Sequence, residues 1–249
     1  MSDIKKQIVH HRSIRKYRSE VIPDDVLRQV LESGTCASNT GNMQMYSMVV
    51  TQDEDLRKQL WEAHFRQNMV LQAPVHITFC ADVNRFSHWC RAREAKPAYE
   101  NLLWFCNAAT DAALASQNVA LAAESFGLGI CYLGTVIYNA ARIVNILQLP
   151  KGVIPVTSLV MGYPDEQPPL TGRLPIEAVV HNETYREFTD KEINSLYAAI
   201  EATEQTRQLL EINQKETLAQ VFTDKRYTQK DNETVSATYL EVMKRQGFL

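Results

Sequence analysis

A short basic segment near the start of the chain carries the side chains best suited to chemistry. It reads His11-Arg12-Ser13-Ile14-Arg15-Lys16-Tyr17 and lacks helical periodicity, so we expect it to be extended. An extended chain places residues 11, 13 and 15 on the same side. Their imidazole, hydroxyl and guanidinium groups, joined by Arg12, form the donor-rich surface that a phosphate monoester and an electron-rich heterocycle require. Taken alone, such a run is also compatible with a solvated basic loop.

The elements that must position this segment alternate between helices and strands. Residue types and turn signals predict strands at Tyr46–Thr51, Val75–Ala81, Ile130–Leu133 and Val153–Met161. Helices are expected at residues 3–9, from Pro23 to a stop at Gly34, between the first two strands, at about Tyr99–Phe126, at Tyr138–Leu147, and from Thr189 onward. Cys36–Met45 and the proline-rich stretch 164–175 are predicted loops. This order favours a layered α+β domain.

A doubly wound nucleotide-binding fold is the alternative for such an order, and the glycines argue against it. The stretch 127–134 reads GLGICYLG, and Tyr132 occupies the position that the third glycine of the dinucleotide fingerprint requires.

The long helix at about 99–126 is rich in alanine. Small side chains let helices approach closely, so we expect this helix in the deepest core or at a dimer seam. Packing within one chain explains the alanines nearly as well.

Composition excludes several classes of function. The chain has 249 residues and a formal net charge of −3, which argues against a nucleic-acid partner. We predict that the five widely spaced cysteines are buried thiols, and the absence of an export signal or a transmembrane run favours a cytoplasmic protein with no membrane association. His88, Cys90 and Cys106 match no tetrahedral metal spacing, so we predict no metal site.

Five motifs, taken in order, resemble those of the nitroreductase family over residues 5 to 190. They are the segment 11–17, Ser38-Asn39-Thr40-Gly41-Asn42-Met43-Gln44, Ala122 to Gly129, Cys131-Tyr132-Leu133-Gly134, and Gly172-Arg173-Leu174-Pro175. Gln67 falls where relatives present a polar side chain to the flavin pyrimidine. The chain is most similar to the larger, NADPH-preferring branch, although Thr171 stands where close relatives often carry Lys.

The resemblance implies a three-layer α+β sandwich with a mostly antiparallel sheet between helices. It further implies a homodimer in which a C-terminal segment crosses to the partner and both FMN molecules lie at the interface. We therefore predict an FMN-binding core at residues 1–188. A helical extension at 189–249 is expected to contribute to the dimer and to the substrate or NADPH site.

The same resemblance assigns the site residues. FMN binding is expected from His11, Arg12, Ser13, Arg15, Ser38, Asn39, Gln67, Tyr132, Leu133, Gly134 and Arg173. Arg15 would face the charge that appears on flavin reduction, whereas Arg12 and Arg173 would hold the phosphate. No side chain is required as a catalytic acid or base, because the cofactor performs the redox chemistry.

These residues predict an FMN-dependent oxidoreductase. It would pass hydride from NADPH or NADH to small planar electron acceptors, nitroaromatic or quinone-type, in two-substrate ping-pong kinetics. The alternatives are an NAD(P)H:flavin reductase and a non-catalytic FMN-binding protein.

Overall fold

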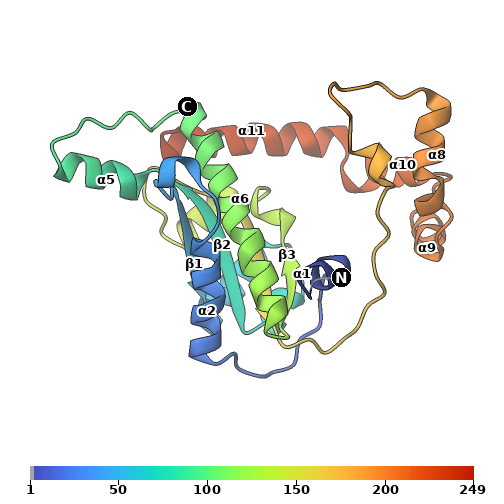
Figure 1. Cartoon of the computed structure of the whole chain (residues 1–249), viewed down its shortest axis with the longest axis horizontal. Helices are drawn as coiled ribbons and strands as arrows, with labels where there is room; N and C mark the ends of the chain where they lie inside the picture. Colours follow the sequence, from blue (N-terminus) through green and yellow to red (C-terminus); the bar gives the residue numbers. More distant parts are fainter. Residues whose placement is uncertain (1–2) are drawn as a thin grey trace. The chain divides into compact units, whose positions relative to one another are not determined.

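The computed structural model describes residues 3–249, and a four-stranded sheet forms its centre (Figure 1). The strands are β1 (Tyr46–Thr51), β2 (Val75–Asp82), β3 (Gly129–Tyr132) and β4 (Val153–Gly162). Their order is β1-β2-β4-β3, and each of the three pairings is antiparallel. The predicted α+β class is therefore confirmed, and the parallel sheet of a doubly wound fold is excluded.

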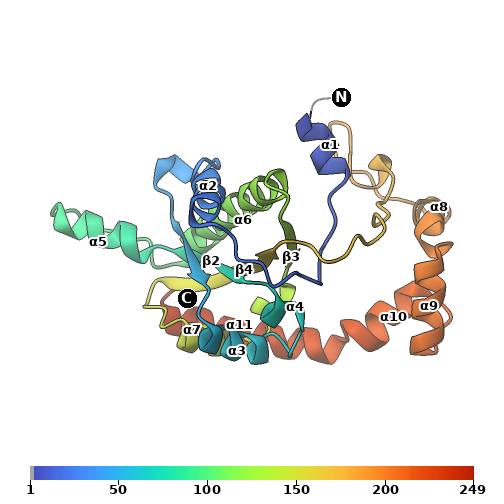
Figure 2. The ribbon, with the colours of Figure 1, turned by 90° about the horizontal axis from the view of Figure 1, so that it is seen from below.

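Helices cover both faces of this sheet, which makes three layers. On one face lie α2 (Asp24–Thr35) and α6 (Leu102–Ser125), and on the other lie α3 (Glu54–Ala63) and α7 (Ala140–Ile146) (Figure 2). All eight residues of β2 are buried, because this central strand is covered on both sides. A run such as Val75-His76-Ile77-Thr78 thus contributes both apolar and polar side chains to the core.

Two predicted helix boundaries were wrong. Gly34 was expected to stop α2, yet the helix continues to Thr35 and Gly34 is buried. A Cβ at Gly34 would lie 2.6 Å from Cγ2 of Val119, so this glycine permits the close approach of α2 and α6. The long helix begins at Leu102 rather than Tyr99, because the Asn101 side chain accepts a hydrogen bond from the amide of Trp104 and caps its first turn.

Shorter elements connect these layers. They are α1 (Asp3–Val9), the 3-10 turn η1 (Thr40–Asn42), α4 (Met69–Gln72), α5 (Asn84–Ala92) and the 3-10 turn η2 (Gly134–Val136). Gly127 ends α6 with a left-handed backbone (φ 75°), as a glycine after a helix should. This stop turns the chain into β3.

The chain forms two compact units. Residues up to Pro169 belong to the first unit together with Val235–Leu249, and Leu170–Thr234 make the second. The second unit contains the 3-10 turn η3 (Ile176–Ala178), α8 (Asp190–Glu201), α9 (Glu204–Asn213), α10 (Leu218–Val221), the π-helical turn η4 (Phe222–Arg226) and the start of α11 (Gln229–Gln246). The functional division at residue 188 stays a prediction.

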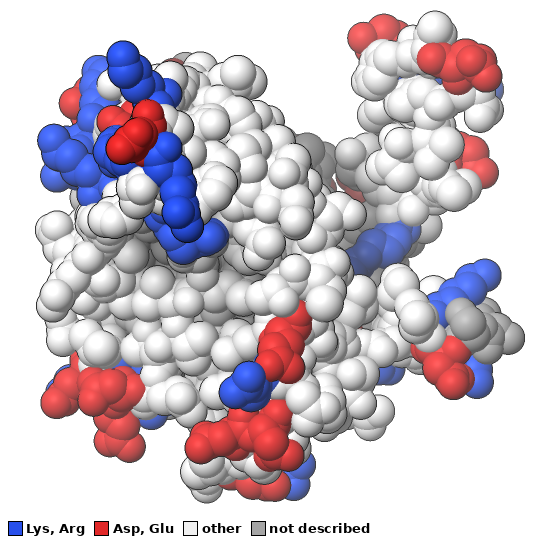
Figure 3. All heavy atoms as spheres, turned by 60° about the vertical axis from the view of Figure 1, so that its left-hand side comes forward, with Lys and Arg blue, Asp and Glu red and all other residues white. Residues whose placement is uncertain are grey.

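Three of the cysteines are buried thiols, as expected, but Cys36 and Cys106 are exposed. Cys36 follows the end of α2, and Cys106 lies on the outer side of α6, so neither is enclosed by the core. Within residues 3–249, no helix is both long and apolar enough to cross a membrane. On the face drawn in Figure 3, basic side chains occur in small groups and uncharged residues cover most of the area.

Candidate functional site

The basic segment is extended and lies beside β3. Ser13 forms a parallel bridge with Ile130, and the Ile14 amide donates to the Ile130 carbonyl at 2.9 Å. Ile14 and Tyr17 are buried, and the Tyr17 hydroxyl donates to the Ile14 carbonyl at 2.6 Å. Burial raises the pKa of that hydroxyl, so Tyr17 stays neutral. The buried side chains of Ile14 and Tyr17 fix the segment to the core, and the polar residues between them stay exposed.

A second strip of backbone holds the segment from its other side. The Arg18 amide donates to the Tyr163 carbonyl at 2.9 Å, and Oε1 of Glu166 accepts the amides of Arg15 and Lys16 at 2.5 and 3.1 Å. Glu166 therefore engages the backbone of Arg15 rather than its guanidinium. Among the described residues, that exposed guanidinium forms no ion pair. Its charge is available to a ligand.

His11 has a partner that sequence analysis did not identify. Its Nδ1 lies 2.5 Å from Oε1 of Glu124, and the two side chains are 30% and 13% exposed. Glu124 stands in the last turn of α6, where a negative charge is unfavourable unless a donor compensates it. An acidic residue at the end of a helix is therefore the sequence signal that could have indicated this contact. Nδ1 makes this contact, and the other ring nitrogen, Nε2, takes no part in it.

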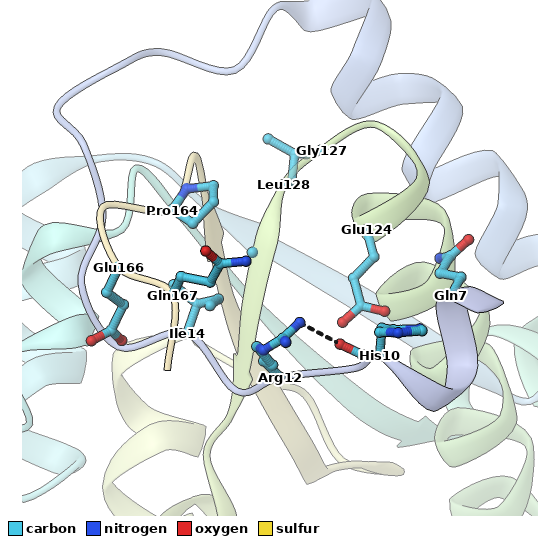
Figure 4. Close-up of a pocket in the computed structure, with 11 residues that line it drawn as sticks. Gln7, His10, Arg12, Ile14, Glu124, Gly127, Leu128, Pro164, Glu166 and Gln167 are labelled. Atoms are coloured by element: carbon cyan, nitrogen blue, oxygen red, sulfur yellow. Dashed lines mark hydrogen bonds between the residues drawn. The ribbon is translucent and has the colours of Figure 1, made fainter. Parts of the chain in front are cut away.

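An open cavity of about 380 Å³ lies beside this segment (Figure 4). It is lined by Gln7, His10, Arg12, Ile14, Glu124, Gly127, Leu128, Gly129, Pro164, Glu166 and Gln167. Arg12 is the one predicted site residue in this lining. Its guanidinium donates through Nε to the Pro168 carbonyl at 2.8 Å and through Nη1 to the His10 carbonyl at 3.1 Å.

The turn that follows β3 leaves open space beside its backbone. Tyr132 is half-buried and its hydroxyl donates to Ser116 Oγ at 3.1 Å, while Leu133 is buried and its amide donates to the Ser158 carbonyl at 2.8 Å. Gly134 is exposed, and a Cβ added there would meet no atom within 4 Å. A planar ligand can therefore approach the backbone at Gly134 closely.

Gln67 is joined to this turn through Thr135. Its Nε2 donates to Thr135 Oγ1 at 3.2 Å and to the His64 carbonyl at 3.1 Å. Phe65 and Arg66 both have left-handed backbones (φ 55° and 57°), which turn the chain sharply enough for Gln67 to fold back. Sequence analysis predicted Gln67 but missed Thr135 and His64, because a lone threonine or histidine gives no spacing signal.

The polar loop at 38–44 is fixed to α6 by a buried carboxylate. Asp111 Oδ1 accepts the amide and the hydroxyl of Thr40 at 2.9 and 3.1 Å. Asn39 accepts the Gln44 amide at 3.1 Å, and Ser38 is exposed. Within residues 3–249, no hydrogen bond joins this loop to residues 11–15 or 132–135. Asp111 was missed because it is one of several polar residues within an alanine-rich helix and no sequence pattern sets it apart.

Arg173 belongs to the second compact unit. It is exposed, and its Nη1 donates to the carbonyl of Gly172 at 3.4 Å. Its part in phosphate binding stays a prediction.

Comparisons with known proteins agree with these landmarks. The model of the Nitroreductase family matches residues 8–163. An FMN reductase [NAD(P)H] from Bacillus subtilis is 36% identical over 196 residues, which cover 74% of this chain and 75% of the relative. An oxygen-insensitive NADPH nitroreductase from Salmonella typhimurium is 34% identical over 191 residues, covering 77% and 78%.

A solved structure extends the likeness to nearly the whole chain. A Bacteroides fragilis protein named only as an oxidoreductase is 48% identical, covers 98% of this chain and 99% of its own, and superposes with a TM-score of 0.97. The match to the family model spans more than half of the chain, and the relatives named above exceed 30% identity over most of their length. The chain therefore belongs to the Nitroreductase family.

Proposed function

We propose that this chain is an NAD(P)H-dependent FMN oxidoreductase that reduces nitroaromatic or quinone-type acceptors. One observation carries the proposal: the donor-rich segment 11–15 runs parallel to β3 and leads along it to the open backbone at Gly134. This arrangement supports a phosphate-binding region beside β3 and a surface for a planar ring at the turn that follows it. Membership of the family, and relatives named for FMN and NADPH, support the cofactor and the electron donor.

The residues present fit FMN. Within the described residues, the Arg15 guanidinium forms no ion pair, Gly134 has space where a side chain would stand, and Gln67 Oε1 accepts no hydrogen bond. A phosphorylated planar heterocycle requires these three features: a cationic donor, an unobstructed plane and polar groups for the ring edge. Bound FMN would supply hydride acceptance and donation.

The residues of the chain bind and orient. Arg12, Ser13 and His11 Nε2 are proposed to hold the phosphate, together with Arg173. Arg15 places a positive charge near the turn, since Ser13 pairs with Ile130 and the Arg15 charge reaches Cys131. Burial raises the pKa of the Cys131 thiol, and the Arg15 guanidinium opposes that rise. The Leu133 side chain is buried and its amide donates to the Ser158 carbonyl, so its proposed part is to hold the backbone of the turn beside Gly134.

A second copy of the chain is proposed to complete the site. The outer side of α6 exposes Leu103 (65%) and Leu114 (44%), and α1 exposes Ile4 (69%). A contiguous apolar patch marks an interface, and we propose that these side chains belong to one. The loop at Ser38 and Asn39 makes no hydrogen bond to the described FMN-binding residues of its own chain, which supports its use by the partner's cofactor. The helical extension at 189–249 is proposed to contribute to the same interface and to the NADPH site.

The purified protein tests the proposal directly. We expect a yellow protein with the absorption spectrum of FMN. Light scattering should give the mass of a dimer, and the absorbance should give two FMN per dimer. NADPH oxidation should depend on an added nitrofuran or quinone, and initial rates should give the parallel-line pattern of ping-pong kinetics. A colourless protein that takes up no FMN would contradict the proposal.

Flavin reduction is the second candidate, favoured by the relative named FMN reductase. In that case free FMN would be the best acceptor. Comparing kcat/KM for FMN, a quinone and a nitrofuran separates the two functions.

A further inference from the structure

A histidine buried behind the turn at Gly134 has no part in the function proposed so far. His64 follows the last residue of α3, has no exposed surface, and contacts Thr135 Oγ1 through Nδ1 at 2.7 Å. Its Nε2 is also buried, and within residues 3–249 that atom has no hydrogen-bond partner. A buried imidazole nitrogen without a partner lowers the stability of the fold, so a histidine at this position needs an explanation.

The imidazole of His64 is neutral at pH 7. Burial lowers its pKa to about 4. The neighbouring His76, whose ring centroid is 5.2 Å away, has a pKa well below the ordinary value, first through burial and then through the charges of His64 and Arg57. A neutral imidazole carries one N–H, so Nδ1 of His64 is either a donor or an acceptor toward Thr135.

Hydrogen-bond accounting at Thr135 decides between the two tautomers. Thr135 Oγ1 already accepts a hydrogen from Gln67 Nε2. If His64 Nδ1 also donated, the Thr135 hydroxyl hydrogen would be left without an acceptor among the described residues. If Nδ1 accepts, the Thr135 hydroxyl donates to it, and among the described residues only the Nε2–H of His64 is left without a partner. The other tautomer leaves two groups without one, the Nε2 lone pair and the Thr135 hydroxyl hydrogen, so the Nε2–H form is favoured.

The same accounting fixes the amide of Gln67. Both of its N–H groups are used, one on Thr135 Oγ1 and one on the His64 carbonyl. Only the carbonyl oxygen, Oε1, remains for a ligand, and it is an acceptor. The donor that a flavin offers along its pyrimidine edge is N3–H, which lies between two carbonyl acceptors.

We propose that His64 is a positioning residue for the flavin: as the Nε2–H tautomer it orders Thr135 and Gln67 so that Gln67 presents an acceptor to N3–H. This inference rests on the proposed function, since it assigns a role toward FMN. It adds His64, behind Thr135, to the proposed site and explains why a histidine is buried at this position.

The chain offers a matched control. His76 is as buried as His64, belongs to the same ring pair and also has an unpartnered Nε2, but its Nδ1 lies 3.5 Å from Thr78 Oγ1 and it does not contact Thr135. His64→Phe removes the acceptor and keeps an aromatic ring. His64→Asn places Oδ1 near the former position of Nδ1 and so keeps an acceptor. His76→Phe makes the same change of volume next to His64 but removes none of the hydrogen bonds that join Gln67, Thr135 and His64.

Two measurements test the proposal. In the flavin-free protein labelled with ¹⁵N-histidine, the NMR shifts should show His64 as the Nε2–H tautomer. With FMN labelled with ¹⁵N at N3, the bound N3–H should be protected from solvent exchange in the wild type, in His64→Asn and in His76→Phe. In His64→Phe the protection should be lost, and FMN should bind about tenfold more weakly. Should His64→Phe fail to fold, Thr135→Val should reproduce its effect.

The outcomes separate the two proposals. An Nδ1–H tautomer at His64, or N3–H protection that survives in both His64→Phe and Thr135→Val, would overturn the positioning role while leaving FMN binding intact. A wild-type protein that binds no FMN would overturn the proposed function, and this inference with it.

Discussion

The two ends of the proposed flavin site are built from different kinds of contact. Residues 11–15 are held by backbone pairing to β3 and by Glu166, and their charged groups lie at or near the surface. At the other end, Gln67 and Thr135 connect the surface to the buried imidazole of His64. The first end is suited to binding by charge and should respond to salt. The second is suited to binding by orientation and should respond to protonation of the core.

The largest expected effect is on stability and arises at the buried end. The pKa of His64 in the folded chain is about 4, below the ordinary value of 6.5, so the unfolded chain takes up a proton first as the pH falls. The free energy of unfolding should therefore be undiminished above pH 6.5 and fall between pH 6.5 and 4. The loss from His64 amounts to about 3 kcal/mol at 1.36 kcal/mol per pKa unit.

Urea unfolding of the wild type and His64→Asn between pH 7 and pH 4 measures this loss. The variant should lack the His64 share of the pH dependence, so its curve should be flatter in that window. All other groups are common to the two proteins, so the difference reports His64 together with its effect on the neighbouring His76. Identical slopes would show that His64 is not held neutral in the folded chain.

The same contrast explains what the sequence could and could not predict. The segment 11–17 was found because its residues are adjacent, and the four strands were placed within one residue because their β-branched and aromatic runs end at turn residues. His64 was missed because its partner lies 71 residues further along the chain. Only tertiary contact can join such residues.

Helix boundaries failed for a related reason. Gly34 has the residue type of a helix stop, but it lies inside the last turn of α2, one residue before the helix ends, and permits the close crossing of α2 and α6. Asp111 likewise looks out of place in an alanine-rich helix until Thr40 is seen to donate to it twice. Short-range patterns led to the exposed groups that are proposed to face the ligand, whereas the buried groups that hold them could be found only in the fold.

The next largest effect is expected at the charged end. Arg12→Ala should weaken FMN binding by about 10-fold to 100-fold, because a charge-assisted contact of about 1.5 to 3 kcal/mol is lost. Added salt should reduce the difference between wild type and variant. Arg18→Ala is the control, since Arg18 is exposed and pairs with Glu20 at 3.3 Å.

Fluorescence titration of flavin-free protein at low and high salt makes this comparison. The weakening caused by His64→Phe should be independent of salt, because no ionised group is removed. A salt-independent loss in Arg12→Ala would mean that Arg12 acts by packing or by its bonds to Pro168 and His10 rather than by its charge.

The smallest expected effect is on the midpoint potential of bound FMN, and it distinguishes Arg12, assigned to the phosphate, from Arg15, assigned to the ring. Arg12 is assigned to the phosphate, whose charge is the same in both redox states, so Arg12→Ala should leave the midpoint potential of bound FMN unchanged. Arg15 is assigned to the ring, where negative charge appears only on reduction, so Arg15→Ala should weaken binding of the reduced form more than the oxidised form. The Arg15 guanidinium is exposed, which limits its differential contribution to about 1 kcal/mol. For a two-electron couple this corresponds to a potential more negative by about 20 mV.

Potentiometric titration of both FMN-loaded variants measures these potentials. Lys16→Ala is the control, because it removes an exposed neighbour and should leave the potential unshifted. Equal potentials in Arg15→Ala and wild type would assign Arg15 to the phosphate with Arg12, and the charged end would then bind without influencing the redox chemistry.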